Sequence, residues 1–367
     1  MGAREKYGLT EVVNARGTYT PLGVSRSSAG VAAAVAEALP EFFVMDELAD
    51  RASLALTAAT GAPAGAVTHC TAASITLAVA AAMTGADPRR IESLPDATNM
   101  HNRVVLPAGH VVGYGQSILQ AVRLSGASVI LAGSAETRCT TEDLDDALSV
   151  DDVSCLLLVS SRLVHGEPVD LTAAVKAAHR RGVPAIIDAA AQFPRTADLL
   201  ATGADLVLIS GQKYLASPTA GLVVGSRRLV QAVRAQENGI GRGMKTTKEA
   251  IVGVLAALEE WQAMDRAKWE ADQAAKVTSF ARRADLIAGL SAEVLADPTD
   301  LPLSRVLLLV ADGIDSAKLA NELRTGSPSI HVLTDEAGLL LELVPLEDDE
   351  LQVVLERLTE ILARLLG

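Results

Sequence analysis

Hydrophobic and polar positions alternate with two different periods along the central part of the chain, from Thr68 to Gly225. Short apolar runs predict buried strands at Val104–Leu106, Ser128–Leu131, Cys155–Val159, Ala185–Ile187, Leu206–Ile209 and Leu222–Val224. Stretches of helical period lie between them, at Thr71–Met83, Gln116–Ser125, Thr141–Leu148 and Leu171–Arg181. Strands separated by helices indicate right-handed crossovers and a mostly parallel sheet. Ligands bind beyond the carboxyl ends of such strands, so chemistry is expected just after each run.

The pattern changes after Gly243. A long helical stretch is predicted from Thr247 to Ala288. It is followed by shorter elements at Val306–Val310, Ser316–Leu323, Ile330–Leu333, Leu339–Leu343 and Asp348–Leu366. The first thirty residues are rich in Gly and Thr and show little periodicity. We therefore expect an N-terminal segment (1–30), a large domain (31–245), a connecting helix (246–275) and a small C-terminal α+β domain (276–367).

Composition narrows the function classes. Of 367 residues, 49% are apolar and 3% aromatic, so the core is built from Ala, Val, Leu and Ile. The formal charge of −13 opposes binding to nucleic acid, and small molecules are the expected partners. The longest apolar stretch, Ala72–Met83, is too short to span a membrane, and the charged segment Met1–Tyr7 does not resemble a signal peptide. Three scattered cysteines (Cys70, Cys139 and Cys155) lack metal-ligand spacing, so a reduced, cytoplasmic, metal-free protein is expected.

The most informative chemistry is a carboxylate and an amine that follow two predicted strands. Asp188 ends the first strand, and Lys213 follows the second through the turn Ser210-Gly211-Gln212. Taken singly, Asp188 is explained as a helix cap and Lys213 as a surface lysine. Together they match the needs of pyridoxal 5′-phosphate (PLP). A carboxylate keeps the pyridine nitrogen protonated, and a lysine amine forms the Schiff base and moves protons at the substrate α-carbon.

The residues around Lys213 resemble a known family. The stretch Ser210–Gly225 is similar to the lysine motif of the L-seryl-tRNA(Sec) selenium transferases and of tRNA-independent relatives such as D-glucosaminate-6-phosphate ammonia-lyase. Further similar segments are Val13–Thr18, Phe43–Gly85, Leu94–Asp96, Gly241–Lys245 and Lys248–Glu249. The resemblance implies the α/β, aspartate-aminotransferase-like fold (PLP fold type I). In that fold a large domain holds a mostly parallel, seven-stranded sheet, and a smaller C-terminal domain is α+β. It also implies a homodimer or a higher homo-oligomer.

Further cofactor contacts are expected near both ends of the ring. The turn before the helix at Thr71–Met83 offers amide groups to the phosphate, with Cys70, Thr71 and Ala72 as candidates. By resemblance, His110 stacks on one face of the ring and Ala190 lies under the other. Gln192 is a candidate for the phenolic oxygen, although it lies one residue later than in the related enzymes. The cofactor set is completed by Ser210, Asp188 and Lys213, and the catalytic candidates are Lys213, Asp188 and His110.

Substrate recognition has several candidates. A guanidinium matches the two oxygens of a carboxylate, which singles out Arg16, Arg162 and Arg242, with Ser161 beside Arg162 and Lys245 as a point charge. For each arginine alone, a surface salt bridge is the ordinary explanation. By resemblance, the pair Arg242 and Lys245 reaches the cofactor of a neighbouring subunit. The stretch Gly326–His331 resembles a small-domain strand of these enzymes, and His331 stands where an arginine is expected.

One carbanion at the α-carbon leads to several reactions, so the sequence predicts a PLP enzyme more firmly than it predicts the reaction. The first choice is a lyase acting on a small amino acid or amino sugar acid. Lys213 removes the α-proton, a group leaves Cβ, and a 2-keto acid and ammonia are formed. The enzyme alternatives are selenium or sulfur transfer, racemisation and transamination. A scaffold or regulator without turnover is the alternative outside enzymes, and it has no need for the pair Asp188 and Lys213.

Overall fold

The computed structural model describes residues 2–335 and 337–366, which form two compact units. The larger unit runs from Ser27 to Ala263. The smaller unit joins the residues up to Arg26 with those from Met264 onwards. The four-part division predicted from the sequence is finer than this and remains a prediction. Within the described residues, no helix combines the length and the apolar run that crossing a membrane requires.

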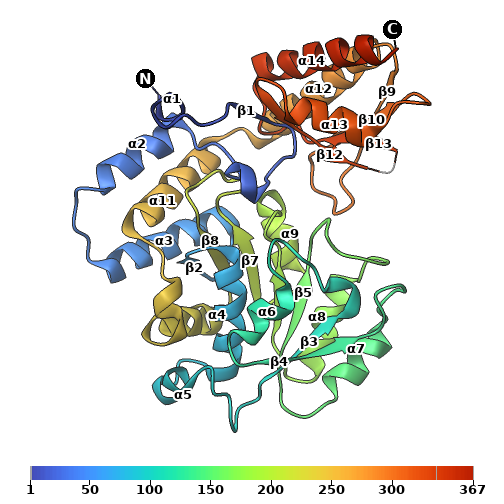
Figure 1. Cartoon of the computed structure of the whole chain (residues 1–367). Coiled ribbons are helices and arrows are strands. Elements are labelled where there is room, and N and C mark those ends of the chain that lie inside the picture. Colours follow the sequence, from blue (N-terminus) through green and yellow to red (C-terminus); the bar gives the residue numbers. More distant parts are fainter. Residues whose placement is uncertain (1, 336, 367) are drawn as a thin grey trace. The chain divides into compact units, whose positions relative to one another are not determined.

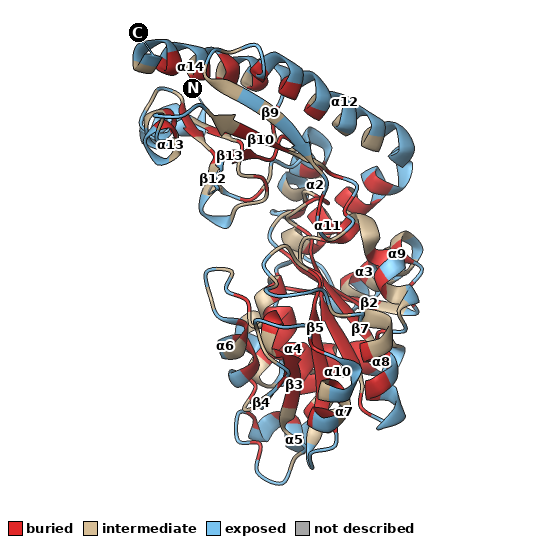
Figure 2. Ribbon diagram, turned by 90° about the vertical axis from the view of Figure 1, so that its right-hand side faces the viewer, coloured by how far each residue is buried: buried red, intermediate tan, exposed pale blue. Residues whose placement is uncertain are grey.

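The larger unit is built on the predicted seven-stranded sheet (Figure 1), whose strands run in the order β2-β8-β7-β6-β5-β3-β4. The strands are β2 (Ala64–Thr68), β3 (Arg103–Pro107), β4 (Ser128–Ala132), β5 (Val153–Val159), β6 (Ala185–Asp188), β7 (Leu206–Ser210) and β8 (Gly221–Gly225). Strands β3 to β7 pair in parallel, whereas β8 is antiparallel to both β7 and β2. The fold class is therefore confirmed. Figure 2 shows β5 and β7 buried along their length, as expected for a sheet that helices cover on both faces, whereas β4 at the edge of the sheet is partly exposed.

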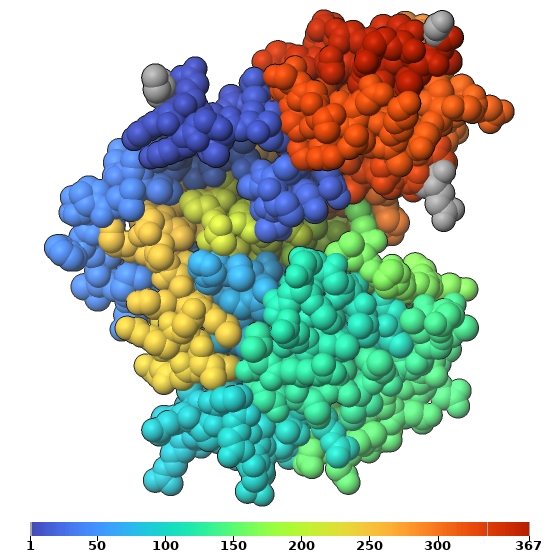
Figure 3. Space-filling model, in the orientation of Figure 1, coloured from blue at the N-terminus to red at the C-terminus, as the bar shows by residue number. Residues whose placement is uncertain are grey.

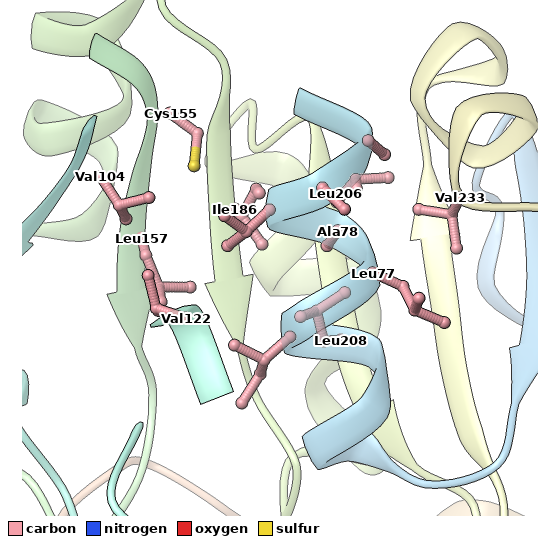
Figure 4. Close-up of a cluster of buried hydrophobic side chains, with 14 of the residues drawn as sticks. Leu77, Ala78, Val104, Val122, Cys155, Leu157, Ile186, Leu206, Leu208 and Val233 are labelled. Atoms are coloured by element: carbon pink, nitrogen blue, oxygen red, sulfur yellow. The ribbon is translucent and has the colours of Figure 1, made fainter. Parts of the chain in front are cut away.

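Helices precede the first strand of this sheet, lie in the connections between its strands and follow the last strand. They are α2 (Ala29–Ala38), α3 (Met45–Thr60), α4 (Thr71–Thr84), α5 (Pro88–Ser93), α6 (Ile118–Arg123), α7 (Thr141–Leu148), α8 (Leu171–Arg180), α9 (Thr196–Ala201), α10 (Arg227–Ala235) and α11 (Lys248–Ala263). Helix α4 is buried almost all round. Its alanines bring the helix close to the sheet, where Ala78 lies near Leu206 and Leu208 of β7, while Leu77 extends toward the side of Val233 on α10 (Figure 4). This packing fixes the start of α4 above the carboxyl ends of the strands.

The smaller unit is α+β, as predicted. Its elements are α1 (Ala3–Tyr7), β1 (Val12–Asn14), α12 (Arg266–Ala284), β9 (Leu290–Leu295), β10 (Arg305–Val310), α13 (Ser316–Arg324), β11 (Ser329–His331), β12 (Leu333–Thr334), β13 (Gly338–Leu341) and α14 (Asp348–Leu366). Four strands form an antiparallel sheet in the order β12-β13-β10-β9. Helices α12, α13 and α14 contribute apolar side chains to one core with this sheet.

Two predicted elements differ from the structure. The single strand expected over Ile330–Leu333 is two strands, because β11 pairs in parallel with β1 while β12 pairs with β13. The continuous helix expected over Thr247–Ala288 is also wrong. It is two helices, α11 and α12, because the side chain of Asp265 accepts a hydrogen bond from the backbone N–H of Lys268 and caps a new helix.

Candidate active site

The carboxyl ends of β5, β6 and β7 lie side by side and carry the candidate chemistry. Val159 pairs with Asp188 at the ends of β5 and β6, and the backbone bonding continues beyond both strands. The N–H of Ser160 donates to the carbonyl of Asp188 at 2.8 Å, and the N–H of Ser210 donates to that of Ala190 at 3.0 Å. Asp188, Ser160 and Ser210 are all buried. The sheet therefore gathers polar groups from three connections at one edge.

Asp188 is a buried carboxylate within reach of the charge of Lys213. Burial raises the pKa of Asp188 to about 6, while the positive charge of Lys213 and the N–H of Ala190 oppose that rise. The N–H of Ala190 lies 3.2 Å from Oδ1 of Asp188. Lys213 is half-buried in a turn, where its backbone N–H donates to the carbonyl of Ser210 at 3.4 Å. The amine and the carboxylate thus act on each other across the edge of the sheet.

His110 is held as a neutral ring beside β5. Only 2% of the residue is exposed, and burial lowers its pKa to about 4. Its Nδ1 accepts a hydrogen bond of 2.9 Å from the backbone N–H of Val159, so the proton of the neutral imidazole lies on Nε2. The preceding Gly109 allows a close approach, because a Cβ there would lie 2.3 Å from the carbonyl oxygen of His165. The ring orientation is therefore set by the backbone.

The start of α4 is fixed by a small hydroxyl network. The hydroxyls of Thr68 and Ser74 lie 2.8 Å apart, and each donates to the carbonyl of Cys70 at 3.2 Å. Strand β8 passes so closely that a Cβ on Gly221 would lie 2.3 Å from Oγ of Ser74 and 2.5 Å from Oγ1 of Thr68. Glycine is required at this position for that approach. Cys70 precedes the helix in extended conformation, and its side chain makes no capping bond.

Two hydroxyl groups near this helix start test whether the site fits PLP. Oγ1 of Thr71 and the phenol oxygen of Tyr114 are buried, and neither has a hydrogen-bond partner within residues 2–335 and 337–366. Such atoms are rare in native structures unless a water, an ion or a ligand bonds them. A hydroxyl at the positive end of α4 suits an anion such as a phosphate ester. A carboxyl with a raised pKa suits a cationic ring nitrogen, so the residues fit the cofactor.

Four other residues predicted to contact the cofactor or the substrate lie in the segments that follow β5 and β6. Gln192 is 1% exposed and, with Ala190, lies in the turn after Asp188. Oγ of Ser161 accepts from the N–H of Leu163 at 3.2 Å, next to half-buried Arg162. Whether any of these residues contacts the cofactor or substrate stays a prediction.

The basic residues predicted to bind substrate lie in two places. Arg242 and Lys245 line a cavity of about 680 Å³ in the larger unit, and Asp188 and Lys213 are not in the described lining of that cavity. The N–H of His69 donates to the carbonyl of Met244 at 3.1 Å and so ties the start of this basic segment to the turn before α4. Arg16 belongs to the smaller unit, where its guanidinium lies 3.8 Å from the ring centre of Tyr19.

Tyr114 was not selected by the sequence reasoning. Its signal is an aromatic residue between Gly113 and Gly115, just after a strand end, in a chain that contains only four tyrosines. Because aromatic residues make up only 3% of the chain, a tyrosine in such a loop is easy to notice. Its buried hydroxyl, however, depends on tertiary packing that the sequence does not display.

Comparison with known proteins agrees with this geometry. The family model described as aminotransferase class-V matches residues 112–323, which is more than half of the chain. The chain belongs to that family. It is a PLP-dependent enzyme of fold type I, so the predicted fold and cofactor are confirmed.

Two curated members of this group align with almost the whole chain. The chain is 36% identical to 5′-C-glycyluridine monooxygenase-decarboxylase of a Streptomyces species, over 97% of this chain and 90% of the relative. It is 31% identical to D-glucosaminate-6-phosphate ammonia lyase of Salmonella typhimurium, over 97% of each chain. The solved structure of a D-glucosaminate-6-phosphate ammonia-lyase superposes with a TM-score of 0.89 at 30% identity, covering 100% of both chains. An L-seryl-tRNA(Sec) selenium transferase of Solidesulfovibrio magneticus is 27% identical over 68% of this chain and 62% of its own length.

Proposed function

We propose that this protein is a PLP-dependent lyase that removes ammonia from an amino sugar acid or a small amino acid by α,β-elimination. The observation that carries the proposal is the match along the entire chain, at a TM-score of 0.89, to a solved ammonia-lyase. The products are a 2-keto acid and ammonia. In this reaction the Cα–H bond and the bond from Cβ to its leaving group break, and hydrolysis then releases the nitrogen.

The residues at the carboxyl edge of the sheet have separate tasks in this reaction. Bound PLP supplies an electron sink for the negative charge that develops at the substrate Cα. Nζ of Lys213 takes the proton from Cα. The carboxylate of Asp188 holds a proton on the ring nitrogen, and that cation in turn stabilises the buried carboxylate, which burial alone drives toward its neutral form.

Further groups position the cofactor. The neutral ring of His110 offers a flat surface for stacking, and its orientation is fixed by the bond to the N–H of Val159. Thr71, together with the first amide groups of α4, provides donors for the phosphate. Cys70 serves as a small residue in this turn and Ser210 as a second hydroxyl. Ala190 lies against the ring face opposite His110, and Gln192 is kept for the phenolic oxygen.

Charge complementarity suggests how the substrate is held. We assign the substrate carboxylate to Arg16 or to Arg162 with Ser161, because a guanidinium bonds both carboxylate oxygens at once. Arg242 and Lys245 are exposed and line a cavity that also contains Asp46, Glu237 and Glu249, and these two cations suit a second anionic group, such as the phosphate of a sugar acid. The net charge of −13 repels anions from most of the surface. A small anionic substrate needs only a local group of cations such as these, whereas nucleic acid needs an extended basic surface.

A second reaction is supported by a specific observation. The monooxygenase-decarboxylase is more similar in sequence, at 36% identity, than the ammonia lyase, at 31%. In the alternative, the bond from Cα to the carboxylate breaks, carbon dioxide leaves, and molecular oxygen is the oxidant, with one oxygen atom entering the product at Cα and the other leaving as water. The two reactions share the cofactor and Lys213 and differ in which bond at Cα is cleaved.

One assay separates these reactions. The purified protein, saturated with PLP, is incubated with D-glucosaminate-6-phosphate and with a panel of amino acids, first in air and then without oxygen. Elimination gives equal amounts of ammonia and 2-keto acid at the same rate in both atmospheres. Carbon dioxide release that stops without oxygen would instead establish oxidative decarboxylation. Inversion of the amino acid would indicate a racemase, an amino-group acceptor requirement an aminotransferase, and selenide consumption a transferase. No change in any substrate would favour a scaffold or regulator.

An exposed apolar segment between α2 and α3 supports a homodimer or higher homo-oligomer. Phe42 is fully exposed, Val44 is 61% exposed, and Leu39, Phe43 and Met45 continue the segment. Figure 3 shows this region (light blue) next to α11 (gold), which packs against both helices. Apolar runs of this kind mark protein interfaces. We expect Phe42→Asp to lower the mass measured by light scattering, and an unchanged mass would contradict this interface.

The three cysteines are all free thiols, which accords with the reducing cytoplasm as the working compartment.

A further inference from the structure

Tyr114 is a half-buried residue in the loop that follows β3, and its phenol oxygen is buried. The loop is closed by a bridge between Gly113 and Ser117 and by a bond of 3.0 Å from the N–H of Tyr114 to the carbonyl of Gln116. Gly115 allows the turn, with φ at +95°. The ring of Tyr114 packs against the large core that α4 forms with the sheet. Its hydroxyl is inaccessible to solvent and lacks a hydrogen-bond partner within the described part of the chain.

A buried hydroxyl without a partner is unfavourable. Leaving one unbonded costs about 1–3 kcal/mol, so its retention in a packed loop points to a partner outside the protein. The chemical nature of that partner follows from the surroundings. Burial above all, and then the negative charge of Asp188, raises the pKa of Tyr114, so its oxygen keeps its proton. A phenol that keeps its proton here acts as a donor, and the strongest acceptors are anions.

Thr71 narrows the choice of acceptor. Its Oγ1 is also buried and without a partner among the described residues, and it begins α4, the helix that contributes to the core against which Tyr114 packs. Two unbonded hydroxyls therefore belong to one neighbourhood, at the positive end of a buried helix. Of the groups of PLP, the phosphate ester is the dianion that such a neighbourhood suits. We infer that the hydroxyl of Tyr114 donates a hydrogen bond to the phosphate of the bound cofactor, beside that of Thr71.

The inference rests on the cofactor and not on the proposed reaction, so binding tests it without turnover. Tyr114→Phe removes one oxygen and keeps the ring in the core. Dissociation constants are measured by equilibrium dialysis for PLP and for pyridoxal, which lacks the phosphate. We expect the constant for PLP to rise about ten- to a hundredfold, the value of a bond to a charged group, and that for pyridoxal to stay within about twofold. Thr71→Val should show the same selectivity, and Tyr7→Phe, at a residue 66% exposed, should change neither constant.

Thermal unfolding provides a second readout that a structural role would not reproduce. Because the hydroxyl bonds nothing within the described chain, apo Tyr114→Phe should unfold at the wild-type temperature or above it. Added PLP should raise the midpoint less in the variant than in the wild type, since stabilisation follows affinity. Equal losses for PLP and pyridoxal would place the hydroxyl on the ring and overturn the inference, as would unchanged constants or a destabilised apoprotein. If the wild-type protein binds PLP and pyridoxal equally, the protein has no phosphate-binding site, and the inference is wrong.

Discussion

The two edges of the seven-stranded sheet each carry an aspartate, and the two aspartates differ in how many hydrogen bonds the protein gives them. At the amino edge, Asp205 precedes β7 and bonds the protein through its backbone N–H, its carbonyl and Oδ2. Its Oδ2 lies 2.8 Å from Nε2 of His179 and accepts the N–H of Ala185 at 2.9 Å. Its carbonyl accepts the N–H of Ser226 at 2.9 Å, and its own N–H donates to the carbonyl of Ala185 at 2.8 Å. Both backbone groups and Oδ2 of this residue therefore hold neighbouring segments of the fold together.

At the carboxyl edge, Asp188 is more deeply buried and less well supported. It receives one backbone N–H at 3.2 Å, from Ala190, and burial raises its pKa to about 6. Thr71 and Tyr114 each carry a buried hydroxyl without a partner in the described chain. Polar groups that bond one another stabilise the fold, whereas polar groups left open are poised for a ligand. Ser226 beside Asp205 also carries such a hydroxyl, so the carboxyl edge is set apart by the buried carboxylate of raised pKa that lies there together with Lys213.

Replacing Lys213 with alanine should have the largest effect. Activity is expected to fall by about three orders of magnitude or more, because proton transfer by a positioned side chain alone is worth ~10²–10⁴-fold. The visible absorbance of the bound cofactor should also be lost, since the amine that bonds it is gone. Lys176→Ala, at an exposed position on α8, is the matched control and should keep both. A colourless wild-type protein, or a yellow and active Lys213→Ala protein, would contradict the proposal that residues at the carboxyl edge bind the cofactor and catalyse the reaction.

Asp188→Asn should have the next largest effect. An amide does not hold the proton on the ring nitrogen as a carboxylate does, so activity should fall by ~10²-fold or more. The pH dependence of apoprotein stability should change as well. The folded-state pKa of Asp188 is raised to about 6 from 3.8, so its contribution to stability is fully present below pH 4 and is lost as the pH rises through 6.

That loss amounts to roughly 2–3 kcal/mol between pH 4 and pH 6. Asp188→Asn should remove it, which denaturant titrations of the apoprotein at several pH values will measure. His110 contributes with the opposite sign in the same range, since its pKa is lowered to about 4 and its stabilisation is lost as the pH falls from 6.5. The difference between wild type and Asp188→Asn isolates the carboxylate. Identical pH profiles for the two proteins would show that Asp188 is not strained by burial.

Asp205→Ala tests the opposite edge. Its removal leaves the N–H of Ala185 without its acceptor and breaks the contact with His179, so the free energy of unfolding should fall by about 2–3 kcal/mol. Turnover at saturating PLP should stay within about twofold of wild type, because the residue lies at the other end of the strands. Urea titration and the ammonia assay measure the two quantities. An activity loss as large as that of Asp188→Asn would break the comparison between the edges.

The sequence predicts the residues at the carboxyl edge better than it predicts where one helix or strand ends and the next begins. Asp188 and Lys213 can be found because strand periodicity is local and because each residue directly follows an apolar run. The break between α11 and α12 was missed, since helix-forming residues continue through it and the single cap at Asp265 decides the boundary. The split between β11 and β12 depends on β1, about 300 residues earlier in the chain, which no local pattern reveals.

The two buried hydroxyls of the site differ in how far the sequence could predict them. Thr71 could be proposed because it begins a helix, a position that a pattern indicates. The burial of the Tyr114 hydroxyl arises from how its loop lies on the core, so its chemistry emerges only from the fold.

His110→Phe should have the smallest effect and sharpens the comparison within the carboxyl edge. Phenylalanine keeps a flat ring for stacking, so the dissociation constant for PLP should rise by no more than about threefold. The N–H of Val159 loses its acceptor, and the free energy of unfolding should therefore fall by about 1–2 kcal/mol. His110→Ala loses the ring as well and should weaken PLP binding further. If Phe and Ala weaken binding equally, the ring does not stack, and His110 belongs with Asp205 among the groups that only support the fold.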